Sequence, residues 1–266
     1  MKITLKEIKR NQRQCVDWYH RVIGMPISIY ITWILLRLNF TANQATTLMI
    51  IFGFISCGFF MVGSRWADLI GLIVLQFWGI MDVVDGEIAR NRKLCSLTGM
   101  YFDKVSHYLV HPFILFSLSV GLFRRFDNTF YIYGGVIASY SYILLEIIYD
   151  VKASIYLLQL CKEGKNQTGA KGFGTPRYQP VPFWLKALKF YLLQPGVLVI
   201  VSVVLLVDLF VGELVLIKIK FNLMALLIIS YAINYTLSFI RSIYNIVLNR
   251  EIDNEYSLFF TVEKNN

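Results

Sequence analysis

Apolar runs of nearly membrane-spanning length recur along the whole chain, and they limit its fold more than any other feature. Several of them approach the ~20 consecutive residues that a helix needs to cross the hydrocarbon core of a bilayer. The composition agrees, because 56% of the 266 residues are hydrophobic and only 16% are charged. A soluble domain carries about 25% charged residues. We therefore expect an all-α integral membrane protein.

The apolar runs predict a bundle of six transmembrane helices. These are expected at about residues 43–62, 66–91, 98–123, 129–156, 195–217 and 221–248. A shorter apolar stretch, 25–38, is expected to form a helix at the membrane interface or beneath the bundle. The predicted organisation is an N-terminal basic and interfacial segment (1–40), a six-helix membrane domain (41–249) and a cytoplasmic tail (250–266).

The formal net charge is +9, and its basic residues gather in a few segments. They concentrate near the N-terminus, after the second predicted span and in a polar, Gly- and Pro-containing loop, 161–185. Basic loops mark the cytoplasmic side of membrane proteins. We therefore expect a multi-pass protein of the cell (inner, cytoplasmic) membrane with both termini in the cytoplasm, and no nucleic-acid partner.

Ionisable side chains cluster where the second and third predicted spans meet. Asp82 and Asp85 lie three residues apart near the end of one span and share a helical face. Asp103 and His107 lie four residues apart near the start of the next. The short connection makes the two helices antiparallel neighbours, so the four side chains are expected to converge near the cytoplasmic side. Ionisable residues within a membrane mark a functional site by default.

Three carboxylates that converge in a partly apolar site repel one another, and a divalent cation is the simplest way to neutralise them. One or two Mg²⁺ or Mn²⁺ ions would keep open positions for substrate phosphates. Such ions polarise phosphoryl oxygens and stabilise a leaving phosphate, and Arg90 can add positive charge. The competing interpretation is that the carboxylates form ion pairs between helices, with Lys104 and Arg90 as partners.

The spacing of these residues resembles the signature of the CDP-alcohol phosphatidyltransferase family. The pattern is D-x-x-D-G-x-x-A-R, eight residues, then G-x-x-x-D, and the likeness covers about residues 40–245. The matching residues are Asp82, Asp85, Gly86, Ala89, Arg90, Gly99 and Asp103. The resemblance implies transfer of a substituted phosphate from a CDP-linked donor, such as CDP-diacylglycerol, to an alcohol acceptor with release of CMP, in phospholipid or related phosphodiester biosynthesis. It also implies a homodimer whose polar cavities open to the cytoplasm.

The resemblance assigns a role to each matching residue. It implies that Asp82, Asp85 and Asp103 hold the divalent metal. The residues that it places around the cytidine-diphosphate group are Gly86, Ala89, Arg90 and Gly99.

One position departs from the family pattern, because His107 stands where a fourth Asp is proposed as the general base. In a first interpretation His107 is itself the base, since a neutral imidazole with an ordinary pKa near ~6.5 accepts protons at physiological pH. In a second it is a nitrogen ligand that favours Mn²⁺ or another transition ion over Mg²⁺. In a third the base is lost and the protein is weakly active or inactive. We expect His111 to be structural and His20 to lie at the surface.

Two further function classes compete with the transferase. A hydrolase of CDP-linked donors would use the same metal site with water as the acceptor. A transporter or a divalent-ion channel would line a pathway with the carboxylates, but its sequence is expected to show paired broken helices or repeated halves. This sequence has a single polar cluster and no internal repeat, which favours an enzyme.

Overall fold

Ten α-helices, one π-helical turn and one hairpin make up the part of the chain that the structure, a computed structural model, describes: residues 4–12, 18–162, 183–192, 196–211, 213–216 and 219–260. In chain order they are α1 (Leu5–Arg10), the π-helical turn His20–Gly24, α2 (Met25–Arg37), α3 (Ala42–Met61), α4 (Arg65–Arg92), α5 (Leu97–Phe126), α6 (Phe130–Lys162), α7 (Phe183–Leu192), α8 (Gly196–Val211), β1 (Leu214–Leu216), β2 (Ile219–Phe221), α9 (Leu223–Leu248) and α10 (Glu251–Phe260).

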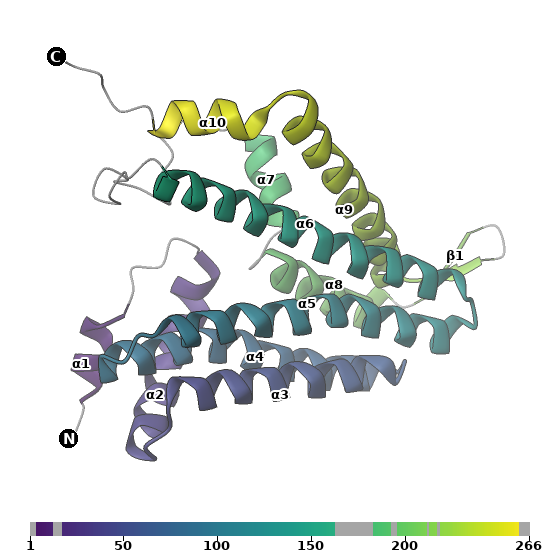
Figure 1. Cartoon of the computed structure of the whole chain (residues 1–266). Helices are drawn as coiled ribbons and strands as arrows, with labels where there is room; N and C mark the ends of the chain where they lie inside the picture. Colours follow the sequence, from purple (N-terminus) through teal and green to yellow (C-terminus); the bar gives the residue numbers. More distant parts are fainter. Residues whose placement is uncertain are drawn as a thin grey trace.

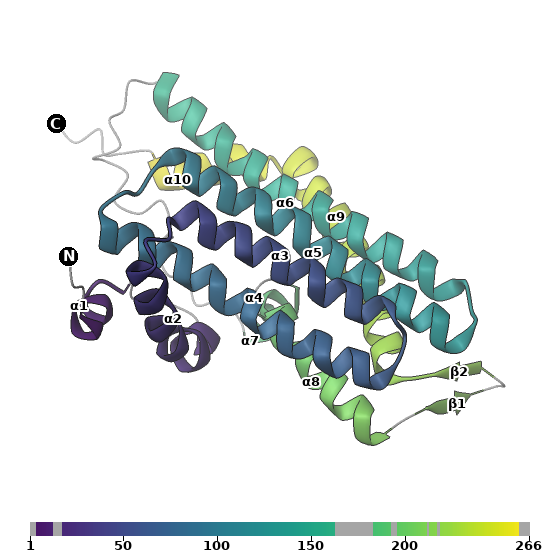
Figure 2. The ribbon, with the colours of Figure 1, turned by 90° about the horizontal axis from the view of Figure 1, so that it is seen from below.

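The long helices run side by side in one bundle (Figures 1 and 2). Helix α3 packs against both α4 and α5, α5 packs against α6, and α6 packs against α9. The shorter α8 contacts α4 and α9 and so joins the two halves of the bundle. Helices α1, α2 and α10 lie toward one end, and the β1–β2 hairpin lies at the opposite end (Figures 1 and 2).

Polar capping residues explain where the long helices begin. Thr41 caps α3 in a reciprocal capping box with Gln44. Ser64, Ser96 and Asn222 cap α4, α5 and α9, each accepting a hydrogen bond from a backbone N–H in the first turn. Because a polar cap satisfies donors that the helix itself leaves free, these short polar turns fix the register of the apolar helices.

Among the described residues, four helices are long and apolar enough to cross a membrane: α3, α4, α5 and α9. The protein is therefore a multi-pass membrane protein. Helix α6 is 33 residues long but lies outside this set, and α8 is apolar with 16 residues. Helices occur at all six predicted positions, while the count of six spans stays a prediction.

The fifth predicted span corresponds to α8, which ends at Val211 and not at residue 217, and β1 and β2 form an antiparallel hairpin after it. Leu214 pairs with Phe221, and Leu216 with Ile219. The rest of the described chain is helical apart from turns and connections, so the all-α expectation holds for the bundle. The alternation of Lys and apolar residues around 217–221 is the pattern of a short strand rather than of a helix end.

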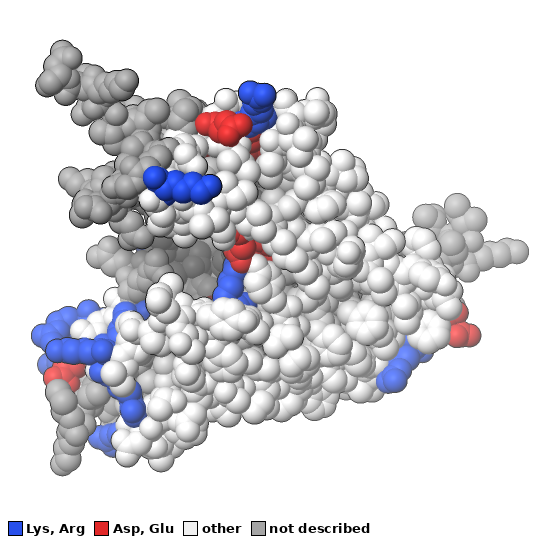
Figure 3. Space-filling view, viewed as in Figure 1, with Lys and Arg blue, Asp and Glu red and all other residues white. Residues whose placement is uncertain are grey.

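The outer surface of the bundle suits a lipid environment. Large apolar side chains are exposed along several helices, for example Phe54, Phe77, Tyr140 and Leu237. Figure 3 shows charged residues gathered mainly near the end that carries α1, with a wide uncharged area across the middle of this face. Close helix contact inside is made possible by glycine, since a Cβ on Gly121 would lie only 2.2 Å from the carbonyl oxygen of Phe60.

The two terminal segments both dock on the bundle. Helix α2 packs on α4 with Ser28 and Thr32 buried, and it exposes Tyr30 and Ile34 on another face. Its place at a membrane interface stays a prediction. In the predicted tail, α10 is tied to α6 through Lys152, whose ammonium lies 2.6 Å from Glu251 and 2.8 Å from Glu255. Most of the predicted loop 161–185 lies outside the described residues.

Candidate metal and phosphate site

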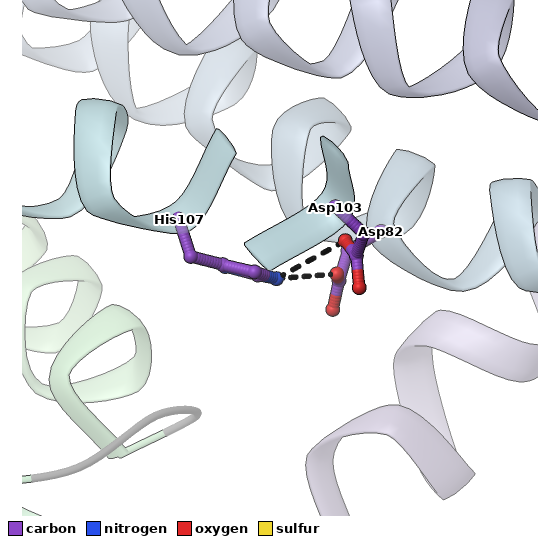
Figure 4. Close-up of side chains that lie close together, drawn as sticks. All are labelled: Asp82, Asp103 and His107. Carbon is purple, nitrogen blue, oxygen red and sulfur yellow. Dashed lines mark ion pairs between the residues drawn. The ribbon is translucent and has the colours of Figure 1, made fainter. Parts of the chain in front are cut away.

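Three of the four predicted ligands come together where the C-terminal half of α4 faces the N-terminal half of α5. His107 Nε2 lies 3.0 Å from Asp82 Oδ1 and 3.4 Å from Asp103 Oδ1. One ligand atom from each of these residues lies within 4.8 Å of the other two. The side chains point toward one another (Figure 4), and each is only partly buried, so small ligands can reach them.

The donor set fits a divalent cation. Asp103 Oδ1 is buried and accepts no hydrogen bond among the described residues, although it faces the His107 ring. A buried carboxylate oxygen without such a donor is costly unless a cation or water satisfies it. Two carboxylates and one imidazole are ligands that Mn²⁺ accepts, and the carboxylates alone suit Mg²⁺.

Asp85 lies beside this group but faces helix α3. It is 8% exposed, and its Oδ2 accepts a hydrogen bond of 2.7 Å from the Thr46 hydroxyl. Asp85 is not one of the three residues whose ligand atoms lie within 4.8 Å of one another. Its role as a metal ligand stays a prediction, and Thr46 is a contact that the sequence did not reveal.

The residues predicted to hold the cytidine diphosphate lie on the same two helices, toward the end of the bundle near α1. A Cβ on Gly86 would lie 3.0 Å from an Arg90 guanidinium nitrogen, so the missing side chain leaves room for that group. Ala89 is in the last turns of α4, where its carbonyl accepts from Leu94 N–H. Gly99 is in the first turn of α5, with its N–H donating to Ser96 Oγ.

The ion-pair interpretation is not supported by the basic residues that it required. Lys104 lies 3.5 Å from Glu146 and 3.2 Å from Asp150, both on α6. Arg90 Nε donates to the backbone carbonyl of Asn11 at 3.1 Å. Within the described residues, neither Lys104 nor Arg90 forms an ion pair with the motif carboxylates.

A chain of polar contacts leads from His107 away from the carboxylates. His107 Nδ1 lies 3.4 Å from His111 Nε2, and His111 Nδ1 lies 2.9 Å from the Tyr142 hydroxyl. The hydroxyl in turn lies 3.4 Å from Glu146 Oε1. His111 is 7% exposed and packs edge-on against Trp78, in keeping with the expected structural role. Its contact with His107 fixes the ring so that Nε2 faces Asp82 and Asp103.

The sequence did not predict that two further residues, His20 and Glu87, lie buried or half-buried in this region. His20 was expected at the surface, but its side chain is only 17% exposed and its Nε2 lies 3.7 Å from Asp82 Oδ2. Glu87, inside the motif, is fully buried. A glutamate in an apolar helix was the available signal for the second, whereas nothing in the sequence links residue 20 to residue 82.

Fold and site together define a multi-pass membrane protein with a carboxylate–imidazole cluster at the meeting point of two antiparallel helices. The family model for CDP-alcohol phosphatidyltransferase matches residues 39–249, and the chain belongs to this family of transferases. Among solved structures, it is similar to the crystal structure of Mycobacterium tuberculosis phosphatidylinositol phosphate synthase (PgsA1) with CDP-DAG bound. That likeness has a TM-score of 0.56 at 15% identity over 84% of this chain and 92% of the other, and it supports the fold. No curated protein sequence matches this chain significantly.

Proposed function

We propose that this protein transfers a substituted phosphate from a CDP-linked donor, CDP-diacylglycerol or a similar compound, to an alcohol acceptor and releases CMP. Its products would enter phospholipid or related phosphodiester biosynthesis. The observation that carries the proposal is the group formed by Asp82, Asp103 and His107, whose ligand atoms lie within 4.8 Å of one another. Family membership supports it, and so does the bound CDP-DAG of the similar structure.

Asp82, Asp85 and Asp103 would hold one or two Mg²⁺ or Mn²⁺ ions. Such ions supply positive charge to the bridging phosphate oxygens and to the departing CMP. The residues that would surround the cytidine-diphosphate group are Gly86, Ala89, Arg90 and Gly99. Gly86 supports this role because its missing side chain leaves space beside the Arg90 guanidinium, a group that binds phosphate well.

His107 would act as the general base, together with Asp103. The acceptor hydroxyl oxygen forms a bond to the phosphorus that carries the substituent, the bond from this phosphorus to the CMP oxygen breaks, and His107 Nε2 takes the hydroxyl proton. The position of Nε2 beside Asp82 and Asp103 supports this assignment, because a cation held by those carboxylates would take up their oxygens and leave Nε2 free to accept the proton. The same geometry supports a ligand role for Nε2, and the two roles predict different metal dependence.

We further propose that the protein lies in the cell (inner, cytoplasmic) membrane with both termini in the cytoplasm. The positions of α1 and α10 toward one end of the bundle, the end where α4 finishes and α5 begins, support this orientation (Figures 1 and 2). Six spans within a membrane domain of residues 41–249, flanked by segments 1–40 and 250–266, and assembly as a homodimer complete the proposal.

The test is release of CMP by the purified protein in lipid nanodiscs with Mg²⁺ or Mn²⁺. CDP-diacylglycerol is supplied with and without a panel of alcohols, and the lipid products are identified by mass spectrometry. Asp82→Asn is expected to lower the rate ~10²–10³-fold, because the ion that stabilises the developing charge loses a carboxylate ligand. Asp68→Asn is the matched control, since it changes a buried carboxylate that pairs with Arg125 instead.

The outcomes separate the candidate functions. Release of CMP that requires an alcohol and yields a new phosphodiester supports the transferase. Release without any alcohol shows the hydrolase. Absence of release from every CDP-linked donor, with a correctly folded protein, contradicts both.

A further inference from the structure

The carboxylate of Glu87 binds the N-terminal segment to the motif helix. Its side chain has no exposed surface. Oε1 accepts hydrogen bonds of 2.7 Å from Ser28 Oγ and 2.6 Å from Gln12 Nε2, and Oε2 accepts one of 2.6 Å from Thr32 Oγ1. A fully buried carboxylate is tolerated only when its oxygens are satisfied in this way. Here the three donors all come from the segment that precedes α3.

Further contacts hold the same segment against α4. Asn11 accepts from Arg90 Nε through its carbonyl, and its side chain donates to Asn91 Oδ1 at 3.0 Å. The Tyr19 hydroxyl donates to Gln76 Oε1 at 2.6 Å. The match to the family model begins at residue 39, so the donors and acceptors of this segment lie outside the matched region.

Docking of this segment brings a second imidazole to the site. Asp82 presents Oδ1 to His107 at 3.0 Å and Oδ2 to His20 at 3.7 Å. Gly24 lets the segment lie close to α4 with the His20 ring beside it, because a Cβ on Gly24 would lie 3.3 Å from the His20 ring and 3.4 Å from the Val83 side chain. The carboxylate of Asp82 is therefore held between one imidazole from α5 and one from the N-terminal segment.

The geometry points to His20 and Glu87 as positioning residues for the metal-binding carboxylate: Glu87 fixes the N-terminal segment on α4, and the segment in turn places His20 against Asp82. Groups that orient a ligating carboxylate from outside the ligand set typically contribute 10–100-fold to metal affinity. This inference rests on the proposed function only in requiring that the cluster binds a divalent cation.

The experiment measures the dissociation constant of Mn²⁺ alone, by electron paramagnetic resonance on the full-length protein in nanodiscs. We expect His20→Ala to weaken Mn²⁺ binding at least ~10-fold, and Ser28→Ala/Thr32→Val to weaken it by a similar factor, within the range for outer-shell partners. These two substitutions remove donors to Glu87 without touching the motif. Ser56→Ala is the matched control, since its buried hydroxyl binds the Gly71 carbonyl between α3 and α4, away from the cluster.

Thermal unfolding of each variant separates positioning from general destabilisation. Ser56→Ala and the Ser28/Thr32 pair are both expected to lower Tm, but only the pair is expected to change the Mn²⁺ affinity. A double-mutant cycle tests the order of action: in a His20→Ala background, the Ser28/Thr32 substitutions should weaken binding less than twofold further. Unchanged Mn²⁺ affinity in His20→Ala, or full additivity in the cycle, overturns the inference.

The failure of this inference differs from the failure of the proposed function. If the unmodified protein binds Mn²⁺ and releases CMP while His20→Ala binds Mn²⁺ equally well, only the positioning role falls. If the unmodified protein binds no Mn²⁺, the metal site and the positioning role both fall.

Discussion

Replacement of His107 by alanine tests the assignment of the general base. The substitution removes Nε2, which lies 3.0 Å from Asp82 and 3.4 Å from Asp103. Loss of a positioned general base typically costs 10²–10⁴-fold in rate. This corresponds to about 3–5 kcal/mol in the activation free energy. We expect the loss in kcat, with the KM for the CDP-linked donor changed little, because the base acts in the transition state.

The assay is the initial rate of CMP release at saturating donor, acceptor and Mn²⁺. His107→Asp is expected to recover at least ~10-fold relative to His107→Ala, since a carboxylate also accepts the hydroxyl proton. His111→Ala is the matched control on the next turn of α5. It removes the ring that contacts His107 Nδ1 but no group that faces Asp82, so we expect a loss of ~10-fold or less, in line with a positioning contact.

Two results would refute the base assignment. Equal losses below fivefold in the two alanine variants would show that His107 is structural. A loss in His107→Ala that disappears when Mn²⁺ is raised above the concentration that saturates the unmodified protein would instead make Nε2 a metal ligand.

Three further predictions concern other helices. Thr46→Val should lower kcat/KM 10–100-fold at limiting Mn²⁺, because Asp85 loses its hydrogen bond from the Thr46 hydroxyl. Thr47→Val should be neutral, since among the described contacts the Thr47 hydroxyl binds only its own helix, and equal effects of the two substitutions would exclude a role of Thr46 in positioning Asp85. Gly53→Ala should lower the free energy of unfolding by about 1–3 kcal/mol, because the added Cβ would lie 2.5 Å from a methyl group of Val110 on α5. In Gly58→Ala the added Cβ would have no described atom within 4 Å, so an equal fall in Tm in both variants would contradict the packing argument. The pKa of Glu255 lies below its ordinary value of 4.5. Burial raises this pKa, but hydrogen bonds from Lys152 and Tyr156 of α6 lower it by more. Docking of α10 on α6 should therefore be complete above pH 4.5 and weaken as the pH falls through the lower pKa of the folded protein. Hydrogen exchange of the α10 amides should become faster over that pH range, and the same pH dependence in Glu255→Gln would refute the role of Glu255.

The sequence predicted the bundle well where a long apolar run begins after a short polar turn. Thr41 marks the start of α3 and Ser96 that of α5, so the first three long helices lie within a few residues of their expected bounds. The convergence of Asp82, Asp103 and His107 follows from helical spacing and a short connection. These features depend on residues that are near one another in the chain.

Contacts between distant segments were not predictable in the same way. Asp82 and Asp85 are three residues apart, which is 300° of helical rotation, so the two carboxylates differ by about 60° in direction. That difference turns Asp85 toward Thr46 on α3 while Asp82 faces His107 on α5. The approach of His20 to Asp82 depends on how the π-helical turn His20–Gly24 and α2 pack on α4, and a single sequence carries no signal for such a pairing.

Diffraction at the manganese absorption edge tests the central claim most directly. Crystals of the protein would be grown with Mn²⁺ and CDP-diacylglycerol. The account predicts an anomalous peak within ~2.5 Å of carboxylate oxygens of both Asp82 and Asp103, with the diphosphate of the donor bound to the same ion. A donor bound elsewhere, or a peak that touches neither carboxylate, would contradict it.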